Sequence, residues 1–139
     1  MKALTVLAAG LAGLALATPV AAADVGGRWL TPTGATIETY SCGNALCGRI
    51  VTSEGLRKNP DMRDTKNSNA SLRSRPVKGL VMLSGFTGGP SKWSGGQVYN
   101  PQDGRTYSGS VELTAPDKLK LTGCALAIFC KSQEWKRVN

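Results

Sequence analysis

The sequence predicts an all-β domain of short antiparallel strands, arranged as a barrel or as a sandwich. Short strand-like runs alternate with clusters of Gly, Pro, Asn and Asp, and no segment keeps a helical apolar stripe over three turns. The clearest run, residues 105–113, alternates apolar and polar side chains. Alternation with a period of two gives a strand one face of which is buried while the other meets water. Short strands at this spacing are typical of barrels and sandwiches.

The first element is a leader that precedes this domain. Met1 and Lys2 are followed by an uninterrupted apolar or small run over residues 3–17, and the small residues 21–23 come directly before Asp24. This pattern is typical of a secretory signal peptide. A retained membrane anchor is the alternative, but the run is short for a hydrocarbon layer of about 30 Å.

The leader determines the expected domain boundaries and cellular location of the chain. Residues 1–23 are expected to be a signal peptide, and residues 24–139 to form a single β-domain with no transmembrane segment. The mature protein is therefore expected to be periplasmic or secreted.

Eight strands are expected after the leader. They are residues 25–30, 35–41, 46–52, 77–86, 95–99, 105–113, 118–122 and 132–138. Between the fifth and sixth of these, residues 101–104 read Pro-Gln-Asp-Gly, a turn whose glycine can take a positive φ. Tyr99 and Tyr107 flank that turn and are expected to pair across the hairpin.

One long basic loop is expected at residues 53–76. The interval is poor in apolar residues and carries six basic side chains between Arg57 and Arg75 against two acidic ones. A long connection of this kind in a compact domain is usually functional or mobile. Two interpretations stay open, a solvated crossing between strands and a lid or anion-binding loop across an open barrel end.

The four cysteines form two local pairs along the sequence. Cys42 and Cys47 enclose four residues, and Cys124 and Cys130 enclose five. Hairpin loops of these lengths bring flanking residues opposite one another, so export favours a disulfide within each hairpin. Cross-linking between the two hairpins is the alternative. Zinc fits poorly because both spacings exceed those of the usual ribbon sites, and no metal site is expected.

The composition narrows the chemistry. The chain has no histidine, which excludes Ser-His-Asp and Cys-His nucleophilic sites. Its acidic residues are scattered without a pairing motif, so no catalytic residue is assigned and no cofactor is expected. A net charge of +8 favours anionic partners, and the exported address disfavours nucleic acid.

Several linked motifs follow one another along the mature chain. They are Gly27-Arg28-Trp29, Cys42-Gly43, residues 46–51, Asp64 with Asn67, Arg73-x-Arg75-Pro76 with Gly79-Leu80, Trp93 with Gly95-Gly96, residues 99–101 with residues 103–107, Leu119 with Leu121, Gly123-Cys124, Cys130 and Trp135-x-Arg137-Val138. Together they resemble an exported bacterial family catalogued as domain of unknown function 2147. The resemblance spans the mature chain and implies an exported β-rich domain. It brings no established activity and therefore no catalytic residue.

A second resemblance concerns architecture. Gly27-x-Trp29 near the start and Arg137 near the end are similar to lipocalin-type barrels, in which an N-terminal Trp lies beneath an Arg of the last strand. This implies a compact, calycin-like, eight-stranded up-and-down barrel with Trp29 and Arg137 at its closure. Such a barrel is either filled by its own side chains or holds one small ligand.

Three functions are compatible with these features. The leading hypothesis is a non-enzymatic binding protein for a small apolar or anionic ligand, held at the barrel mouth by Arg73, Arg75 or Trp93. The alternative is a cell-envelope interaction or stress-protective module whose basic face meets anionic surfaces. The third is an enzyme that works with carboxylates alone.

Overall fold

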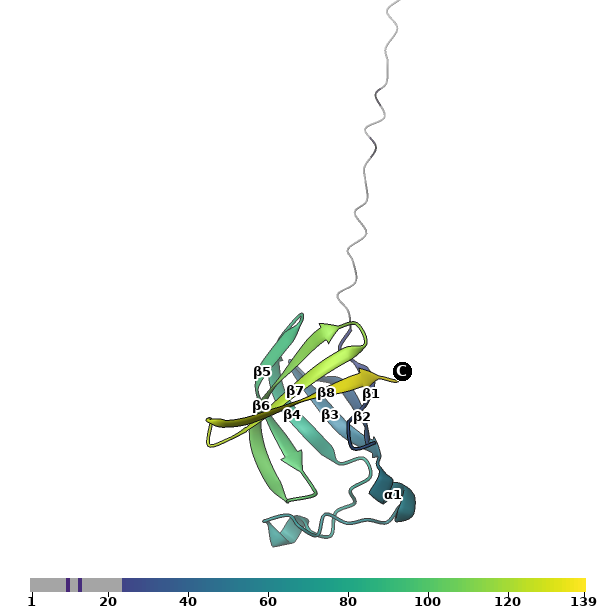
Figure 1. The fold of residues 1–139 in the computed structure, drawn as a ribbon, viewed down its shortest axis with the longest axis vertical. Coiled ribbons are helices and arrows are strands. Elements are labelled where there is room, and N and C mark those ends of the chain that lie inside the picture. The colour runs from purple at the N-terminus through teal and green to yellow at the C-terminus, as the bar shows by residue number, and fades with distance from the viewer. Residues whose placement is uncertain (1–9, 11–12, 14–23) are drawn as a thin grey trace, which may run out of the picture.

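The computed structural model describes Gly10, Gly13 and residues 24–139. The cleavage site and nearly all of the expected signal peptide lie outside the described residues. Eight strands follow one another around a closed barrel (Figure 1). They are β1 Gly27–Leu30, β2 Thr36–Cys42, β3 Ala45–Thr52, β4 Val81–Gly88, β5 Lys92–Asn100, β6 Arg105–Ala115, β7 Lys118–Ala125 and β8 Phe129–Arg137.

Every strand pairs antiparallel with the next, and β1 also pairs antiparallel with β8. In that last pair Trp29 lies opposite Arg137 and Leu30 opposite Lys136. Because the first and last strands are neighbours in one sheet, the architecture is a barrel and not a sandwich. The predicted all-β, eight-stranded up-and-down fold is confirmed.

Side chains of the barrel's own strands occupy its interior. The largest fully buried ones are Trp29, Trp135, Phe86, Ile37, Leu83, Leu119 and Val111. The packing depends on small partners, since a Cβ on Gly96 would lie 2.3 Å from the Phe86 ring. The two tryptophans and the Phe86 ring therefore occupy space that a larger barrel would leave to a ligand.

Several predicted strand limits differ from those observed. The fourth strand was expected from residue 77 but begins at Val81, because Leu80 N donates to Val77 O (3.0 Å) and Gly79 takes a φ of +79° in a turn. β7 and β8 extend three residues further toward their shared turn than expected. Tyr99 lies opposite Thr106 and Tyr107 opposite Val98, so the predicted Tyr99–Tyr107 pair was wrong by one residue of register.

The segment between β3 and β4 has more structure than the long basic loop expected there. It contains α1 Glu54–Lys58 and a 3₁₀ turn, η1 Ala70–Leu72. Ser53 caps α1 by accepting a hydrogen bond from Leu56 N on its hydroxyl at 3.1 Å. The segment lies across one end of the barrel, at the bottom of Figure 1.

The local disulfide pairing is confirmed. Cys42 bonds Cys47 between β2 and β3, and Cys124 bonds Cys130 between β7 and β8. In the part of the chain that the structure describes, no helix has the length and apolar character needed to cross a membrane.

Candidate functional site

A fully buried carboxylate lies at the end of the barrel covered by residues 53–76, here named the crossing segment. Asp64 Oδ1 accepts a hydrogen bond from the Tyr99 hydroxyl at 2.6 Å. Its Oδ2 accepts from Asn67 Nδ2 and from Arg75 Nε, both at 2.9 Å. These three donors join the crossing segment to β5, because Tyr99 belongs to that strand while the other residues belong to the segment.

The hydrogen bonds keep Asp64 ionised. Burial raises the pKa of the Asp64 carboxyl, but the donors Tyr99, Asn67 and Arg75 together outweigh burial and leave the pKa below its ordinary value. Burial also raises the pKa of the Tyr99 phenol, and the hydrogen bond to the Asp64 carboxylate raises it further. The group is therefore a fixed ion pair with a neutral phenol donor.

Arg75 has a second contact besides the ion pair. Its guanidinium carbon lies 5.1 Å from the centroid of the Tyr99 ring, a cation–π distance. The backbone holds it as well, since Asp64 N donates to Arg75 O at 3.0 Å. The Arg75 side chain is nevertheless 36% exposed. A guanidinium is thus held rigidly at the surface with part of it facing solvent.

Arg75 faces an open hollow of about 230 Å³. The hollow is lined by Asn67, Ser68, Leu72, Arg75, Val81, Ser84, Gln97, Tyr99, Gly104 and Thr106. Ser84 and Gln97 lie opposite one another, directly beside the buried pair Leu83 and Val98. Because side chains alternate along a strand, Ser84 and Gln97 point away from the interior. The hollow therefore lies on the outer wall of β4 to β6, beneath the crossing segment.

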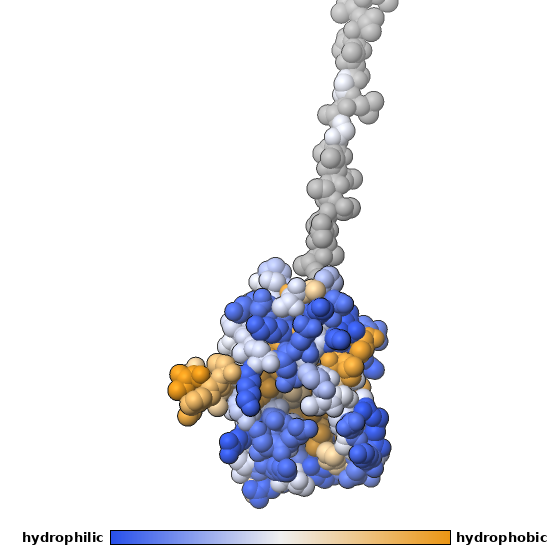
Figure 2. Space-filling model, viewed as in Figure 1, coloured by the Kyte–Doolittle hydropathy of each residue, from blue (hydrophilic) through white to orange (hydrophobic). Residues whose placement is uncertain are grey.

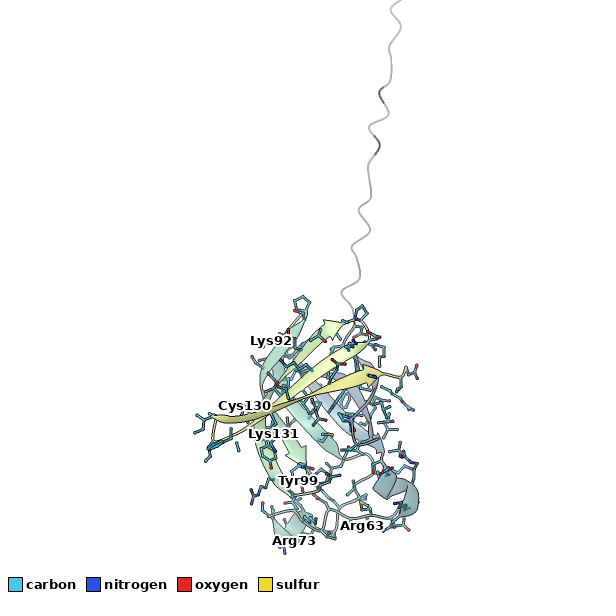
Figure 3. All side chains as sticks on the ribbon, in the orientation of Figure 1. Arg63, Arg73, Lys92, Tyr99, Cys130 and Lys131 are labelled. Carbon is cyan, nitrogen blue, oxygen red and sulfur yellow. A yellow bond between two sulfur atoms is a disulfide. The ribbon has the colours of Figure 1, made fainter. Side chains whose placement is uncertain are left out.

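The structure separates the three ligand-binding residues expected from the sequence. Arg75 lines the hollow. Arg73 instead donates from Nε to Asn67 O at 2.8 Å and so helps to shape the crossing segment. Trp93 adjoins Lys92, at the opposite end of β5 from Tyr99 (Figure 3). The three side chains therefore do not form one site.

The sequence did not identify the polar strand residues that line the hollow beside Arg75. Ser84 and Gln97 are ordinary outward residues of alternating strands, and nothing in their spacing distinguishes them. Tyr99 and Thr106 fall within a motif of the family resemblance that gives no indication of this role. Asp64 and Asn67 carried one signal, since both are polar residues in a motif of the family resemblance, but their burial was not expected.

The site's chemistry favours binding over catalysis. Asp64 already accepts three hydrogen bonds, and its lowered pKa makes it a weak base. Within residues 24–139, no cluster of three His, Cys, Asp or Glu side chains could hold a metal ion. What the hollow offers a ligand is a positioned cation surrounded by hydroxyl and amide groups.

Comparison with known proteins agrees with the fold. A solved structure of protein HP1028 from the human pathogen Helicobacter pylori, described as belonging to the lipocalin family, superposes with a TM-score of 0.75. The two chains are 24% identical, and 84% of each is covered. This likeness shows a lipocalin-like barrel. No curated protein matches the chain.

The family is shown by a match over most of the chain. Residues 27–137 match the sequence family described as "Uncharacterized protein conserved in bacteria (DUF2147)". The match runs from the first residue of β1 to the last residue of β8 and includes every residue of the Asp64 site. The chain therefore belongs to the DUF2147 family of uncharacterized bacterial proteins.

Proposed function

We propose that this protein is a non-enzymatic, extracytoplasmic barrel that binds a small molecule carrying a carboxylate or phosphate group in the hollow beside Arg75. The observation that carries the proposal is the way Arg75 is held. Asp64 accepts a hydrogen bond from its Nε, and the Tyr99 ring lies within cation–π distance of its guanidinium carbon. Among the described residues no hydrogen-bond partner takes up its two Nη groups, which are the pair that binds an anion in bidentate fashion.

The other lining residues suit the same ligand. Gln97, Ser84 and Thr106 offer an amide and two hydroxyls, which can donate to further oxygens of an anion. Leu72 and Val81 are 37% and 45% exposed and provide an apolar rim for a short hydrocarbon portion. A polar centre with an apolar rim favours a small organic acid or phosphate ester over a wholly apolar ligand.

The size of the hollow limits the ligand. About 230 Å³ is below the range of roughly 300–1,000 Å³ typical of sites for drug-sized molecules. Trp29, Phe86 and Trp135 occupy the interior, which disfavours a long apolar chain there. The lipocalin-family description of the Helicobacter pylori protein supports ligand binding by the fold in general, while the position of the site on the outer wall is proposed from this structure alone.

The proposal includes a location outside the cytoplasm, which two features support. The leader pattern of residues 1–23 is typical of export. Two disulfides with no free cysteine in residues 24–139 are typical of proteins in oxidising compartments. Both features support a periplasmic or secreted protein.

An NMR titration tests the function. Acetate, citrate, inorganic phosphate and glycerol 3-phosphate are added separately to the isotope-labelled protein, and backbone amide shifts are followed. At least one probe is expected to shift the amides of Ser68, Arg75, Gln97 and Gly104 in a saturable way. If none of the four saturates in the millimolar range, the proposal is wrong.

A matched pair of variants localises the binding. Ser84→Leu fills the hollow without touching the Asp64 ion pair and is expected to weaken binding at least about tenfold. Ser94→Leu places the same side chain on an exposed position of β5 outside the hollow and is expected to leave the affinity unchanged. Equal affinity of both variants and the wild type would place the ligand elsewhere.

A further inference from the structure

The turn between β7 and β8 projects from the barrel. β6 pairs with β7 only as far as Ser108 opposite Cys124, and β1 pairs with β8 only at Lys136 and Arg137. β7 and β8 continue to pair with each other as far as Ala125 opposite Phe129. Beyond Cys124 the hairpin therefore has no neighbouring strand on either side, and it stands out at the left of Figure 1.

The end of this hairpin is entirely apolar. Residues 125–129, here named the apolar tip, read Ala-Leu-Ala-Ile-Phe. Leu126, Ile128 and Phe129 are 84%, 74% and 66% exposed, more than any other large apolar side chain that the structure describes. They form the protruding orange cluster of Figure 2. Large apolar side chains gathered on a protrusion mark a surface that meets a partner.

A disulfide and a hydrogen bond constrain the apolar tip. The Cys124–Cys130 disulfide closes its base, and Ile128 N donates to Ala125 O across the turn at 3.4 Å. Leu126 and Ala127 have φ angles of 54° and 60°, a left-handed pair that hairpin turns usually fill with Asn and Gly. The chain thus places a leucine at the extreme of the turn where the backbone favours a small polar residue. A fixed tip loses little conformational freedom on binding.

Basic side chains lie behind the apolar tip. Lys131 directly follows Cys130 and is exposed on β8, as Figure 3 shows. The hairpin from residue 118 to residue 137 carries five basic residues and a single acidic one, Glu134. The whole chain has a net charge of +8. An apolar end with cations behind it matches a lipid surface, in which anionic headgroups cover an apolar layer.

We propose that the apolar tip inserts into the interfacial region of an anionic lipid membrane and attaches the barrel to it reversibly. A lipid layer accepts a convex apolar protrusion without a complementary pocket, and its anionic headgroups attract the lysines of the hairpin. Insertion by about 5–10 Å, the depth typical of interfacial segments, covers the side chains of Leu126, Ile128 and Phe129. The hollow beside Arg75 is built from other strands, so this attachment does not depend on the proposed small ligand.

Co-sedimentation with vesicles tests the proposal. The protein is mixed with vesicles of pure phosphatidylcholine, or of phosphatidylcholine with 30% phosphatidylglycerol, at low and at high salt. Binding to the phosphatidylglycerol vesicles is expected, with weaker binding at high salt and on pure phosphatidylcholine. Wild-type protein that stays in the supernatant with all vesicles would overturn the proposal.

Two double variants test whether vesicle binding depends on the apolar tip or on exposed apolar side chains in general. Leu126→Ser/Ile128→Ser is expected to lower the vesicle partition coefficient at least about tenfold while the circular dichroism spectrum is unchanged. Leu30→Ser/Val138→Ser removes two exposed apolar side chains outside both the apolar tip and the hollow, and is expected to leave the vesicle partition coefficient unchanged. All variants keep the same N-terminus, so any contribution from it cancels. Equal losses in both double variants would overturn the proposal.

Charge reversal tests the role of the lysines. Lys120→Glu/Lys131→Glu is expected to weaken binding to phosphatidylglycerol vesicles at least about tenfold and to leave binding to pure phosphatidylcholine unchanged. Sedimentation velocity without lipid tests the alternative that the apolar tip binds a second copy of the chain. A dimer that Leu126→Ser/Ile128→Ser converts to a monomer would overturn the membrane proposal in favour of self-association.

Discussion

The guanidinium carbon of Arg137 lies 4.3 Å from the centroid of the Trp29 ring, at the seam where the last strand of the barrel meets the first. Trp29 is fully buried, and its Nε1 donates to Thr39 Oγ1 at 3.0 Å. Arg137 also donates to three backbone carbonyls, those of Pro116, Gly26 and Asp24. The pair therefore ties the chain segments before β1 and after β6 to the barrel.

Replacing Trp29 by Ala is expected to lower the free energy of unfolding by about 3–5 kcal/mol, because it empties part of the core and removes the stacked cation. Arg137→Lys keeps the charge but loses the planar guanidinium and its several N–H donors. A smaller decrease in the free energy of unfolding, about 1–2 kcal/mol, is therefore expected. Urea unfolding followed by circular dichroism measures both. A larger effect for Arg137→Lys than for Trp29→Ala would show that the carbonyl hydrogen bonds, and not the buried ring, dominate the closure.

How far the sequence predicts the fold depends on the kind of signal each element carries. The alternation of residues 105–113 predicts β6 because a buried face and a wet face leave a period of two. The predicted register across the preceding turn, residues 101–104, was wrong, since Tyr99 pairs with Thr106 and not with Tyr107. A slip of one residue exchanges the two faces of a strand, and only the turn geometry decides it.

The two proposed sites show the limit of reasoning from the sequence. Asp64 and Tyr99 are 35 residues apart, and their hydrogen bond depends on how the crossing segment closes over β5. Residues 125–129 were expected to be a five-residue hairpin loop, and nothing in Ala-Leu-Ala-Ile-Phe shows whether such a loop packs on the barrel or projects from it. Tertiary placement created both features, so local patterns could not predict them.

The buried ion pair predicts an acid-sensitive stability. Because the folded-state pKa of Asp64 lies below its unfolded value, its contribution is complete above the ordinary aspartate pKa of about 3.9. It is lost as the pH falls through the lower folded-state pKa, where the unfolded chain takes up the proton first. Asp64→Asn is therefore expected to be about 3 kcal/mol less stable at pH 7 and to show a flatter decline in acid.

Glu38 supplies the matched control for that experiment. Hydrogen bonds from Arg49 and Arg28 also lower the pKa of this carboxyl, but Glu38 is on the outer wall among exposed partners. Solvent screens such pairs, so Glu38→Gln is expected to change the acid limb little. Urea midpoints between pH 2 and pH 7 compare the variants. A flatter acid limb in Glu38→Gln than in Asp64→Asn would contradict the central role of Asp64.

The two disulfides are expected to differ in what they stabilise. Cys42–Cys47 lies within the barrel wall, where Cys47 is buried, so the Cys42→Ala/Cys47→Ala variant is expected to lose about 2 kcal/mol of global stability. The hairpin closed by Cys124–Cys130 can open beyond Cys124 without breaking another strand pair. The Cys124→Ala/Cys130→Ala variant is expected to lose less than about 1 kcal/mol of global stability and to show faster amide exchange in residues 125–129.

Urea unfolding and native-state hydrogen exchange on both double-alanine variants distinguish these effects. Equal global losses would mean that the projecting hairpin folds and unfolds with the barrel. Peptide mapping without reductant checks the pairing itself, and a fragment joining Cys42 to Cys124 or Cys130 would contradict it.

Gly104 is expected to be indispensable to the Arg75 site although it supplies no side chain. It has a φ of +72°, and its N donates to Asn100 O at 2.8 Å in the turn between β5 and β6. The backbone of the crossing segment passes so close that a Cβ on Gly104 would lie 1.7 Å from Lys66 O. Asn67, the residue after Lys66, donates to Asp64. The close contact between Gly104 and Lys66 therefore holds both the turn and the ion pair in place.

Gly104→Ala must therefore both strain a left-handed backbone and push residues 64–75 away from β5. A loss of about 2–4 kcal/mol is expected, with the ring of Tyr99 released from Arg75 and the hollow opened. Gly43→Ala is the matched control, because Gly43 has a similar φ of +65° with nothing within 4 Å of its added Cβ, so only the backbone cost of about 1 kcal/mol is expected. Urea unfolding gives the two losses, and the NMR shifts of Asn67 and Tyr99 report the site. If the two glycine variants lose equal stability and Gly104→Ala keeps the wild-type shifts, close packing of the crossing segment on the turn does not hold the site together.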